Sequence, residues 1–588
     1  MADDKKGFRF GTFVRLIAQA APYRIIFILA GVLAVLLAPV GVLRPYLINH
    51  MVDNQIIQSD YDGLIFMTGL LFVILFVEAF MRYGFIYSTN FLGQSIIRDL
   101  RKRVFNHLVR LKLNYFDRTP IGQSTTRTIN DIETINQTFS QGVITIVADV
   151  LSIFAVLGIM FYTSWQLTLV VLTTLPVLWI GTYYFKEGVK ISYQRVRNQI
   201  SKMNSFLQER ISGMRVVQIF NAEEQEAEKF KTINRDYTEA NLKSIFYYAL
   251  FFPFVEIVSA AALGLLVWYG AKSVLQEDIT LGVLVAFPIY INMLFRPMRM
   301  LADRFNTLQM GLVAAHRVFN VLDNDEMITD AGQIEKENIE GKIEFDHVYF
   351  SYDDENLILK DIDFTVEPGE TLAIVGSTGS GKTTIINLIN RFYDVNKGRI
   401  SIDGDPIQKY KLNNLRRHLA IVLQDVFLFS GTLFDNISLK DPSITKEEVI
   451  EASKLIGAHE FFDDLPDKYD FWISERGNNL SMGQRQLISF VRALIFKPNI
   501  LILDEATSSI DTETEAIIQH AIETLIKKRT SIIIAHRLST IRHADKILVL
   551  HQGRIKEFGS PEELLQIENG WYKDLYENQF LSKAKASA

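Results

Sequence analysis

The residues with the clearest capacity for chemistry form a glycine-rich run, Gly376-Ser-Thr-Gly-Ser-Gly-Lys-Thr-Thr384, that fits the spacing G-x-x-x-x-G-K-[ST]. Glycines let the backbone curl, so that successive N–H groups and a following helix start point at phosphate oxygens. Lys382 adds a positive charge and Thr383 a hydroxyl for Mg²⁺. We therefore expect a nucleoside triphosphate to be held by Gly376, Ser377, Thr378, Gly379, Ser380, Gly381, Lys382, Thr383 and Thr384.

The segments on either side of this run support a phosphate loop over a glycine-rich surface turn without a ligand. The apolar stretch Thr371–Val375 is entered through the turn Glu367–Glu370 and predicts a buried strand. From Lys382 to Phe392, apolar residues recur at helical spacing. The order strand, loop, helix is the structural context that a phosphate loop requires.

Two acids follow a second buried strand. Ile500–Leu503 is continuously apolar and ends in Asp504 and Glu505. Because ligands of parallel sheets bind at the carboxyl ends of the strands, Asp504 is placed to hold the Mg²⁺ shell and Glu505 to polarise a water that attacks the terminal phosphate. Such an ending is also common where a strand reaches the surface, and the upstream phosphate loop favours the functional interpretation.

Two further segments could contact phosphate. Ser481 is a good N-cap for a helix running through Leu487 and Leu494, and the free N–H groups at that helix start form an anion site. The strand Ser531–Ala535 ends at His536, whose neutral imidazole could donate to the γ-phosphate. A purely structural cap and a purely structural histidine are the alternatives. The capping box from Thr445 to Glu448 predicts only a helix start.

Composition divides the chain into a membrane part and a soluble part. Hydrophobic residues make up 48% of the 588 residues, and long uncharged runs are confined to the first half. A net charge of -6 with no basic face or tail gives no indication of a nucleic-acid partner. The chain has no cysteine, which excludes disulfides and thiolate sites. Ala18-Gln-Ala20 precedes the first apolar run instead of following it, so we expect no cleaved signal peptide.

Six apolar runs have the length of membrane spans, about 20 residues each. They are Ile25–Leu43, Leu64–Ile86, Val143–Tyr162, Leu167–Phe185, Phe246–Tyr269 and Ile279–Leu294. The two long connections are basic, the first through Arg98, Arg101, Lys102, Arg103, Arg110, Lys112, Arg118 and Arg127, the second between Lys186 and Lys243. The positive-inside rule then places both long loops, both termini and the soluble domain in the cytoplasm. Apolar residues at helical spacing predict that the spans continue as helices into these loops.

Three acids fall within the predicted spans. Glu78, Asp149 and Glu256 are costly in lipid and should face the bundle interior or an aqueous cavity. For Glu78 a pair with Arg82, one helical turn on, is the alternative to a role in the transport path. For Asp149 and Glu256 the alternative is a polar contact near a helix end.

The sequence therefore predicts a membrane protein with an all-α six-helix transmembrane domain and an α/β P-loop NTPase domain. We expect the transmembrane domain at residues 1–323, with a short surface helix around Phe8–Ile17 before the spans. An acidic linker covers 324–342, and the nucleotide-binding domain covers 343–582, opening with an antiparallel strand from Ile343 to Tyr352.

Taken together and in order, these motifs make the chain resemble a half-transporter of the ABC exporter family, of the bacterial multidrug or lipid exporter type. The resemblance covers nearly the whole chain and implies ATP with Mg²⁺ as cofactor and the bacterial cytoplasmic membrane as location. It implies that Tyr352 stacks on adenine and that Gln424 senses Mg²⁺ and the membrane domain. Ser481, Met482, Gly483 and Gln484 match the family's signature motif, Glu505 its catalytic base, Asp511 its D-loop and His536 its switch histidine.

Further segments resemble the family's accessory elements. Glu475–Gly477 is similar to the exporter X-loop, Phe116–Gly122 to the lead-in of the first coupling helix, and Gly213–Asn221 to the second. The signature motif departs from the family because Met482 replaces its first glycine. If Ser481 is the N-cap, Met482 is helical and keeps its N–H, so the site should survive.

The resemblance implies that two half-transporters bind two ATP at their interface and export a substrate by alternating access. Met482 and the D-loop serines Ser508 and Ser509 favour a heterodimer over a homodimer. The spans contact membrane lipids, and their apolar composition fits an amphipathic or lipid-like small molecule. One rival is an ATP-gated channel or regulatory membrane protein built on the same dimerising ATPase. Another, a soluble P-loop enzyme with a membrane anchor, needs a single span.

Overall fold

The computed structural model describes residues 10–328, 330–353, 355–504, 512–535, 541 and 544–577. They fall into two compact units. The first runs to Val109 and resumes from Ile121 to Asn324, and the second combines Arg110–Pro120 with the chain from Asp325 onward. A short piece of the first long loop therefore belongs to the unit that contains the phosphate loop.

The first unit is helical. Its main helices are α1 (Phe10–Ala18), α2 (Arg24–Met51), α3 (Tyr61–Leu108), α5 (Ile121–Thr126), α6 (Ile132–Gln137), α7 (Ile144–Thr163), α8 (Trp165–Leu172), α9 (Leu175–Ser212), α10 (Met214–Ile219), α11 (Glu223–Leu275) and α12 (Leu281–Leu322). Within the part of the chain that the structure describes, six helical stretches are long and apolar enough to cross a membrane, which confirms the predicted six spans. The expected fourth span is divided into α8 and α9 at Thr173 and Thr174, whose hydroxyls donate back to carbonyls of the preceding turn.

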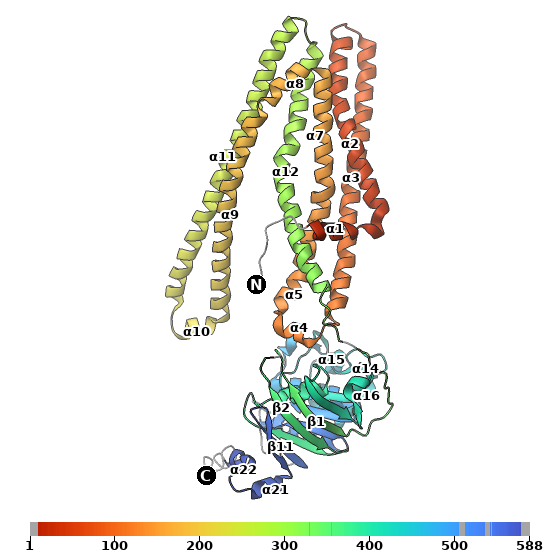
Figure 1. Cartoon of the computed structure of the whole chain (residues 1–588), viewed down its shortest axis with the longest axis vertical. Helices are drawn as coiled ribbons and strands as arrows, with labels where there is room; N and C mark the ends of the chain where they lie inside the picture. Colours follow the sequence, from red (N-terminus) through yellow and green to blue (C-terminus); the bar gives the residue numbers. More distant parts are fainter. Residues whose placement is uncertain are drawn as a thin grey trace. The chain divides into compact units, whose positions relative to one another are not determined.

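Within this unit, α9 and α11 run alongside each other and lead to the short helix α10, leaning away from α2, α3, α7 and α12 (Figure 1). The rings of Phe185 and Phe251 stack between these two helices, with centroids 3.8 Å apart. The remaining helices pack around a core that includes Leu92, Phe139 and Ala315, all of which are fully buried.

Two of the three acids within the predicted spans are paired with arginines, as their cost in an apolar medium requires. Glu78 accepts from Arg82 at 2.9 Å and lies 3.9 Å from Arg44 of α2, so the helical pair offered as the alternative to a transport role is present. Asp149 of α7 forms an ion pair with Arg304 of α12. Glu256 lies on an exposed face of α11.

The second unit contains two principal sheets. The strands β2 (Leu359–Val366), β1 (Ile343–Phe350), β4 (Lys397–Ile402) and β5 (Asp405–Pro406) form an antiparallel sheet in that order. A second sheet has the order β12 (Arg554–Gly559), β11 (Lys546–His551), β3 (Thr371–Val375), β10 (Thr530–Ile534), β9 (Ile500–Asp504) and β6 (Leu419–Val422). All neighbours in it are parallel except β11 and β12.

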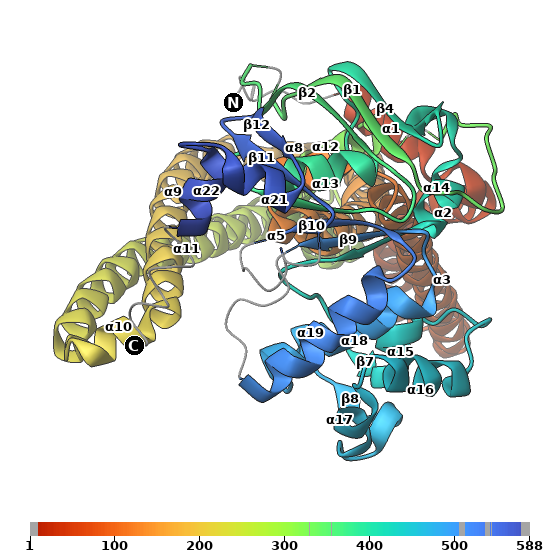
Figure 2. The same cartoon turned by 90° about the horizontal axis from the view of Figure 1, so that it is seen from below.

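Both faces of the larger sheet are covered, which explains why its central strands are continuously apolar. The helix α13 (Lys382–Ile389) lies with the antiparallel sheet on one face, and its Ile385 and Leu388 are fully buried. On the other face lie α15 (Leu433–Ser438), α16 (Lys446–Leu455), α18 (Met482–Ile495) and α19 (Thr512–Ile526) (Figure 2). The membrane-plus-α/β fold class is therefore confirmed.

Two element ends differ from the prediction. The first strand ends at Phe350 and not at Tyr352, because the next backbone N–H, of Ser351, bonds to the Asn396 side chain at 2.8 Å. The helix after the phosphate loop ends at Ile389 instead of reaching Phe392. Its C-cap residue Asn390 bonds back to the carbonyl of Ile386 at 2.9 Å, and Arg391 takes a positive φ of 51°.

One carboxylate helps to hold the acidic segment directly before β1. The Asp403 side chain accepts from the backbone N–H groups of Glu340, Gly341 and Lys342 at 2.8, 2.9 and 2.8 Å. Hydrogen bonds to a charged acceptor are stronger than neutral ones. Asp403 therefore fixes the point where the acidic segment enters the sheet.

We predict that Asp403→Ala lowers the thermal unfolding midpoint of the full-length protein by about 4–8 °C, because it leaves three backbone donors without their acceptor. The matched control is Asp363→Ala, which removes an exposed carboxylate whose recorded ion-pair partner, His347 Nε2, lies 3.6 Å away. Differential scanning fluorimetry of the detergent-solubilised protein provides the measurement. Equal midpoints for the two variants would contradict the role given to Asp403.

Candidate functional site

The parallel strands bring the predicted site residues to one edge of the larger sheet. Ile374 of β3 pairs with Ile534 of β10, which in turn pairs with Asp504 of β9. On the far side of β9, Leu503 pairs with Val422 of β6, two residues before Gln424. Because these strands run in the same direction, the phosphate loop after β3, Asp504 and Gln424 all lie at their carboxyl ends.

The phosphate loop depends on glycines for its backbone path. Gly379 has φ +81° and Gly381 has φ +108°, which L side chains rarely adopt. A Cβ on Gly381 would also lie 2.7 Å from a methyl of Leu359, whereas nothing lies within 4 Å of the same position on Gly379. The loop is therefore closely packed at Gly381 and open to solvent at Gly379.

Side chains of the loop fit a polyphosphate. Lys382 is 7% exposed, and its ammonium donates to the carbonyls of Gly376 and Ser377 at 2.8 and 3.1 Å. Among the described residues, the buried Ser380 hydroxyl meets no hydrogen-bond partner. Thr383, the next residue after the lysine, is exposed, so its hydroxyl is accessible to a metal ion. Buried polar groups of this kind need acceptors, and phosphate oxygens would supply them.

Tyr352, the predicted adenine-stacking residue, lies close to the phosphate loop. Its hydroxyl donates to Thr384 at 3.2 Å and accepts from Asn387 at 3.3 Å, so the ring is held against α13. It makes edge-to-face contacts with Phe350 and Tyr393, with ring centroids 4.8 and 5.0 Å apart. The structure therefore places Tyr352 beside the loop that would hold the phosphates.

The signature segment opens α18 as expected. The Ser481 hydroxyl accepts from the N–H of Gln484 at 3.2 Å, and the Gln484 side chain accepts from the N–H of Ser481 at 2.7 Å. This reciprocal pair is a capping box. Met482 is the first helical residue and Gly483 is buried. The N–H groups of Met482 and Gly483 are therefore left for an external acceptor.

A partly buried arginine, not singled out by sequence reasoning, joins α18 to the segment after Gln424. Arg492 donates to the carbonyls of Asn436 at 2.9 Å and Phe427 at 3.4 Å. Burial lowers the pKa of its guanidinium from the ordinary value, although arginine remains charged near neutral pH. The Gln486 side chain, also on α18, donates to the carbonyl of Gln424 at 3.5 Å. The signature helix and the Gln424 segment are thus hydrogen-bonded to each other.

Three predicted site residues, Glu505, Asp511 and His536, lie outside the described residues. Their positions along the chain still follow from their neighbours, because Glu505 comes directly after β9 and His536 shortly after β10. The segment resembling the X-loop, Glu475–Gly477, is described, and the carbonyl of Arg476 accepts from Arg485 of α18 at 3.4 Å. The second coupling-like segment is α10, whose Val216, Ile219 and Phe220 are largely exposed.

The first coupling-like segment, Phe116–Gly122, is shared between the two units. Its first three residues end α4 (Leu113–Arg118), which packs within the second unit, whereas Ile121 and Gly122 begin α5 in the first unit. Lys112 pairs with Asp394 at 3.0 Å, the Tyr393 hydroxyl donates to Asp117, and Arg118 donates to the carbonyl of Tyr352 at 3.1 Å. The similarity of Phe116–Gly122 to a coupling segment indicated this region. Tyr393 carried no comparable signal and was missed.

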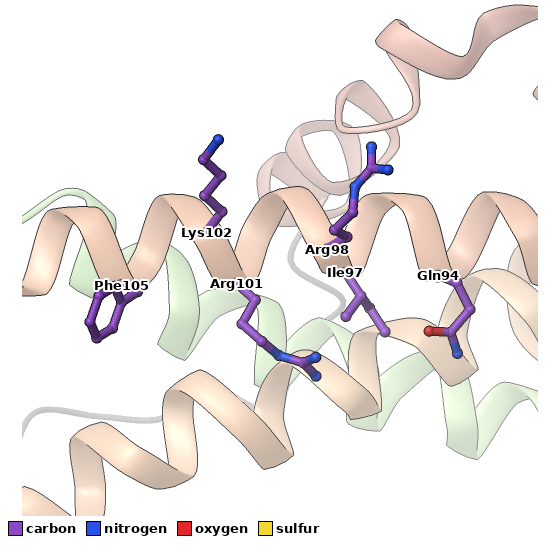
Figure 3. A pocket seen from close by; sticks show the side chains of 6 residues that line it. All are labelled: Gln94, Ile97, Arg98, Arg101, Lys102 and Phe105. Carbon is purple, nitrogen blue, oxygen red and sulfur yellow. The ribbon is translucent and has the colours of Figure 1, made fainter. Parts of the chain in front are cut away.

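A shallow hollow on α3 lies in the first unit. It is lined by Gln94, Ile97, Arg98, Arg101, Lys102 and Phe105 (Figure 3). Arg98 also donates to the hydroxyl of Tyr23 at 2.9 Å, directly before the first apolar run. These basic residues therefore lie level with the start of a span, where the positive-inside rule expects cations on the cytoplasmic side.

Comparison with known proteins agrees with this arrangement. Residues 27–298 match the family described as ABC transporter transmembrane region, and residues 359–508 match the family described as ABC transporter. The chain is 41% identical over 582 residues to the uncharacterized ABC transporter ATP-binding protein YknV of Bacillus subtilis, covering 98% of this chain and 96% of that protein.

Two other relatives carry names that state an activity. A probable multidrug resistance ABC transporter ATP-binding/permease protein of Bacillus subtilis, YheH, is 38% identical over 89% of this chain and 78% of its own length. An ATP-dependent lipid A-core flippase of Syntrophus aciditrophicus is 36% identical over 97% of this chain and 95% of that protein.

The chain belongs to the ABC transporter family and has the fused membrane and ATPase domains of an exporter half-transporter. It is an ATP-binding ATPase coupled to transport and a multi-pass membrane protein. The recognition made from its motifs is therefore confirmed.

The position of Met482 leads to a testable prediction. Because it is the first helical residue and its N–H is kept, Met482→Gly should change kcat for ATP hydrolysis by less than about threefold. Ser481→Ala removes the cap, which costs about 1 kcal/mol, and should lower kcat more strongly. Steady-state ATPase assays on the purified transporter compare the two variants. A larger loss in Met482→Gly than in Ser481→Ala would contradict the role given to the cap.

Proposed function

We propose that this chain is one half of a dimeric exporter that uses ATP hydrolysis to move an amphipathic or lipid-like molecule out of the bacterial cytoplasm by alternating access. The observation that supports coupling most directly is the placement of α4. The chain between the second and third spans contributes this helix to the compact unit that contains the phosphate loop. A change at the nucleotide site can therefore pull on two spans through covalently continuous backbone.

The proposed chemistry uses the residues assigned from the sequence. Lys382 and the N–H groups of Gly376–Thr384 bind the phosphates, and Tyr352 stacks on the adenine. Thr383, Gln424 and Asp504 would hold Mg²⁺, which when bound offsets the charge of the phosphate oxygens. Glu505 accepts a proton from the attacking water, and His536 donates to the γ-phosphate. Asp511 and the segment Ser481–Gln484 complete the site of the partner chain.

A second half-transporter is supported by exposed apolar surface on α10. Val216, Ile219 and Phe220 are 60, 73 and 75% exposed. Such a cluster at the tip of a long helical hairpin is expected to be covered in the assembled protein. We propose that another half-transporter covers it, and Met482 favours a heterodimer. Co-purification of an untagged, different ATPase chain with the tagged protein would identify such a partner.

The domain boundaries remain as proposed from the sequence, with the transmembrane domain at 1–323, a linker at 324–342 and the nucleotide-binding domain at 343–582. The division between Asn324 and Asp325 supports the first boundary. The contacts of Asp403 with Glu340, Gly341 and Lys342 support a linker whose end is anchored to the nucleotide-binding domain.

The location proposed is the cytoplasmic membrane, with both termini and the ATPase domain in the cytoplasm. The basic residues of α3 near Tyr23 support this orientation. The relatives include a multidrug protein and a lipid A-core flippase, which supports an amphipathic or lipid-like substrate. A soluble enzyme with one anchor does not fit six spans. An ATP-gated channel remains the alternative, and ATP-driven accumulation against a gradient in sealed vesicles separates it from an exporter.

Glu505→Gln provides the test of the catalytic assignment. We expect it to bind ATP with unchanged affinity and to lose at least about 100-fold in kcat, because general-base catalysis contributes roughly that much. Lys382→Ala is the matched comparison and should lose ATP binding itself. Binding is measured by equilibrium dialysis with labelled ATP and turnover by phosphate release. Normal turnover in Glu505→Gln would reject Glu505 as the base.

A further inference from the structure

The inference concerns the aromatic cluster beside the nucleotide site, and it rests on the proposed adenine-stacking role of Tyr352. Phe350, Tyr352 and Tyr393 contact one another edge to face, with centroid separations of 4.8, 5.0 and 5.8 Å. In a cluster of this kind a rotation of one ring displaces its neighbours, because the interior is closely packed.

Tyr393 also reaches α4. Its hydroxyl donates to the carboxylate of Asp117, and it is partly buried against the core of the antiparallel sheet. Burial and this hydrogen bond raise the pKa of the Tyr393 hydroxyl well above its ordinary value. The hydroxyl therefore stays protonated at physiological pH and remains a donor to Asp117.

A second contact joins α4 to the main chain of Tyr352. Arg118 donates to the backbone carbonyl of Tyr352 at 3.1 Å, so residues 117 and 118 reach the side chain of Tyr393 and the main chain of Tyr352. The Tyr352 ring is held from the other side by Thr384 and Asn387 of α13. Tyr352 thus links α13, which follows the phosphate loop, to α4, which comes from the connection between the second and third spans.

We propose that Tyr393 is a positioning residue that transmits the placement of the Tyr352 ring to α4 through its hydrogen bond with Asp117. The chain would thereby respond to the base of the nucleotide as well as to its phosphates. Binding of a base against Tyr352 shifts that ring, Tyr393 follows, and Asp117 moves with it. A polyphosphate without a base occupies the phosphate loop but does not shift Tyr352, Tyr393 or Asp117.

The ion pair between Lys112 and Asp394 offers a matched control. It also ties α4 to the residue next to Tyr393, but through side chains that are 35 and 51% exposed. Exposed pairs contribute little energy. If α4 only needs tethering, loss of this pair and loss of the Tyr393 contact should have comparable effects.

The experiment uses a fluorescent reporter on α4 in the full-length protein. The chain has no cysteine, so Leu113→Cys, at a position 40% exposed, takes a single environment-sensitive label. ATP is titrated without Mg²⁺, so that binding is read without hydrolysis. Tyr393→Phe removes the donor of the hydrogen bond and Asp117→Leu removes its acceptor, and Lys112→Met with Asp394→Asn are the controls.

We expect ATP to change the fluorescence of the reporter, and Tyr393→Phe or Asp117→Leu to reduce the amplitude by at least about half, with the ATP concentration for half response shifted less than about threefold. The double variant Tyr393→Phe/Asp117→Leu should match the single ones, since both remove one interaction. The control variants should keep the full amplitude. Tripolyphosphate, which has no base, should compete with labelled ATP and leave the reporter unchanged.

The outcomes separate this inference from the proposed function. Absence of ATP binding in the unaltered protein would overturn both. Normal ATP binding, lost in Lys382→Ala, with a full reporter response in Tyr393→Phe would overturn only the role of Tyr393. A full response to tripolyphosphate would also overturn it. An equal loss of reporter amplitude in the Lys112 and Asp394 control variants would show that Tyr393 only tethers α4. Thermal unfolding of each variant verifies that the fold is kept.

Discussion

The parallel register of β3, β10, β9 and β6 is the constraint on which the rest of the ATPase domain depends. It brings the ends of four segments distant in the chain to one edge of a sheet. Apolar strands covered on both faces maintain this register, because a slip would bury polar ends and expose isoleucines. This packing places the phosphate loop, Asp504 and Gln424 at the same edge of the sheet.

A second constraint comes from the polar groups that join the site to its surroundings. The capping box at Ser481 orients the start of α18, and Arg492 hydrogen-bonds that helix to the segment after Gln424. Tyr352 bonds through its hydroxyl to α13 and through its backbone carbonyl to Arg118 of α4. It is therefore hydrogen-bonded both to the helix that follows the phosphate loop and to the helix from the connection between the second and third spans.

The sequence predicted those features that depend on residues close together along the chain. Apolar runs of sufficient length predicted the six spans, and a serine directly before an apolar helical repeat predicted the helix cap at Ser481. Strand and helix ends were less accurate, because the N–H of Ser351 bonds to Asn396, far along the chain. Pairs such as Asp149 with Arg304 and Tyr393 with Asp117 were not predictable, since their partners meet only after folding. Nor could periodicity show that Arg110–Pro120 packs within the ATPase unit.

The central claim is that nucleotide bound at the phosphate loop acts through α4 on the transmembrane helices of the same chain. Hydrogen–deuterium exchange on the full-length protein in lipid nanodiscs, with and without ATP, measures this most directly. The account predicts that ATP slows exchange both at residues 376–384 and at residues 110–120. Protection confined to the phosphate loop, with exchange at 110–120 unchanged, would contradict it.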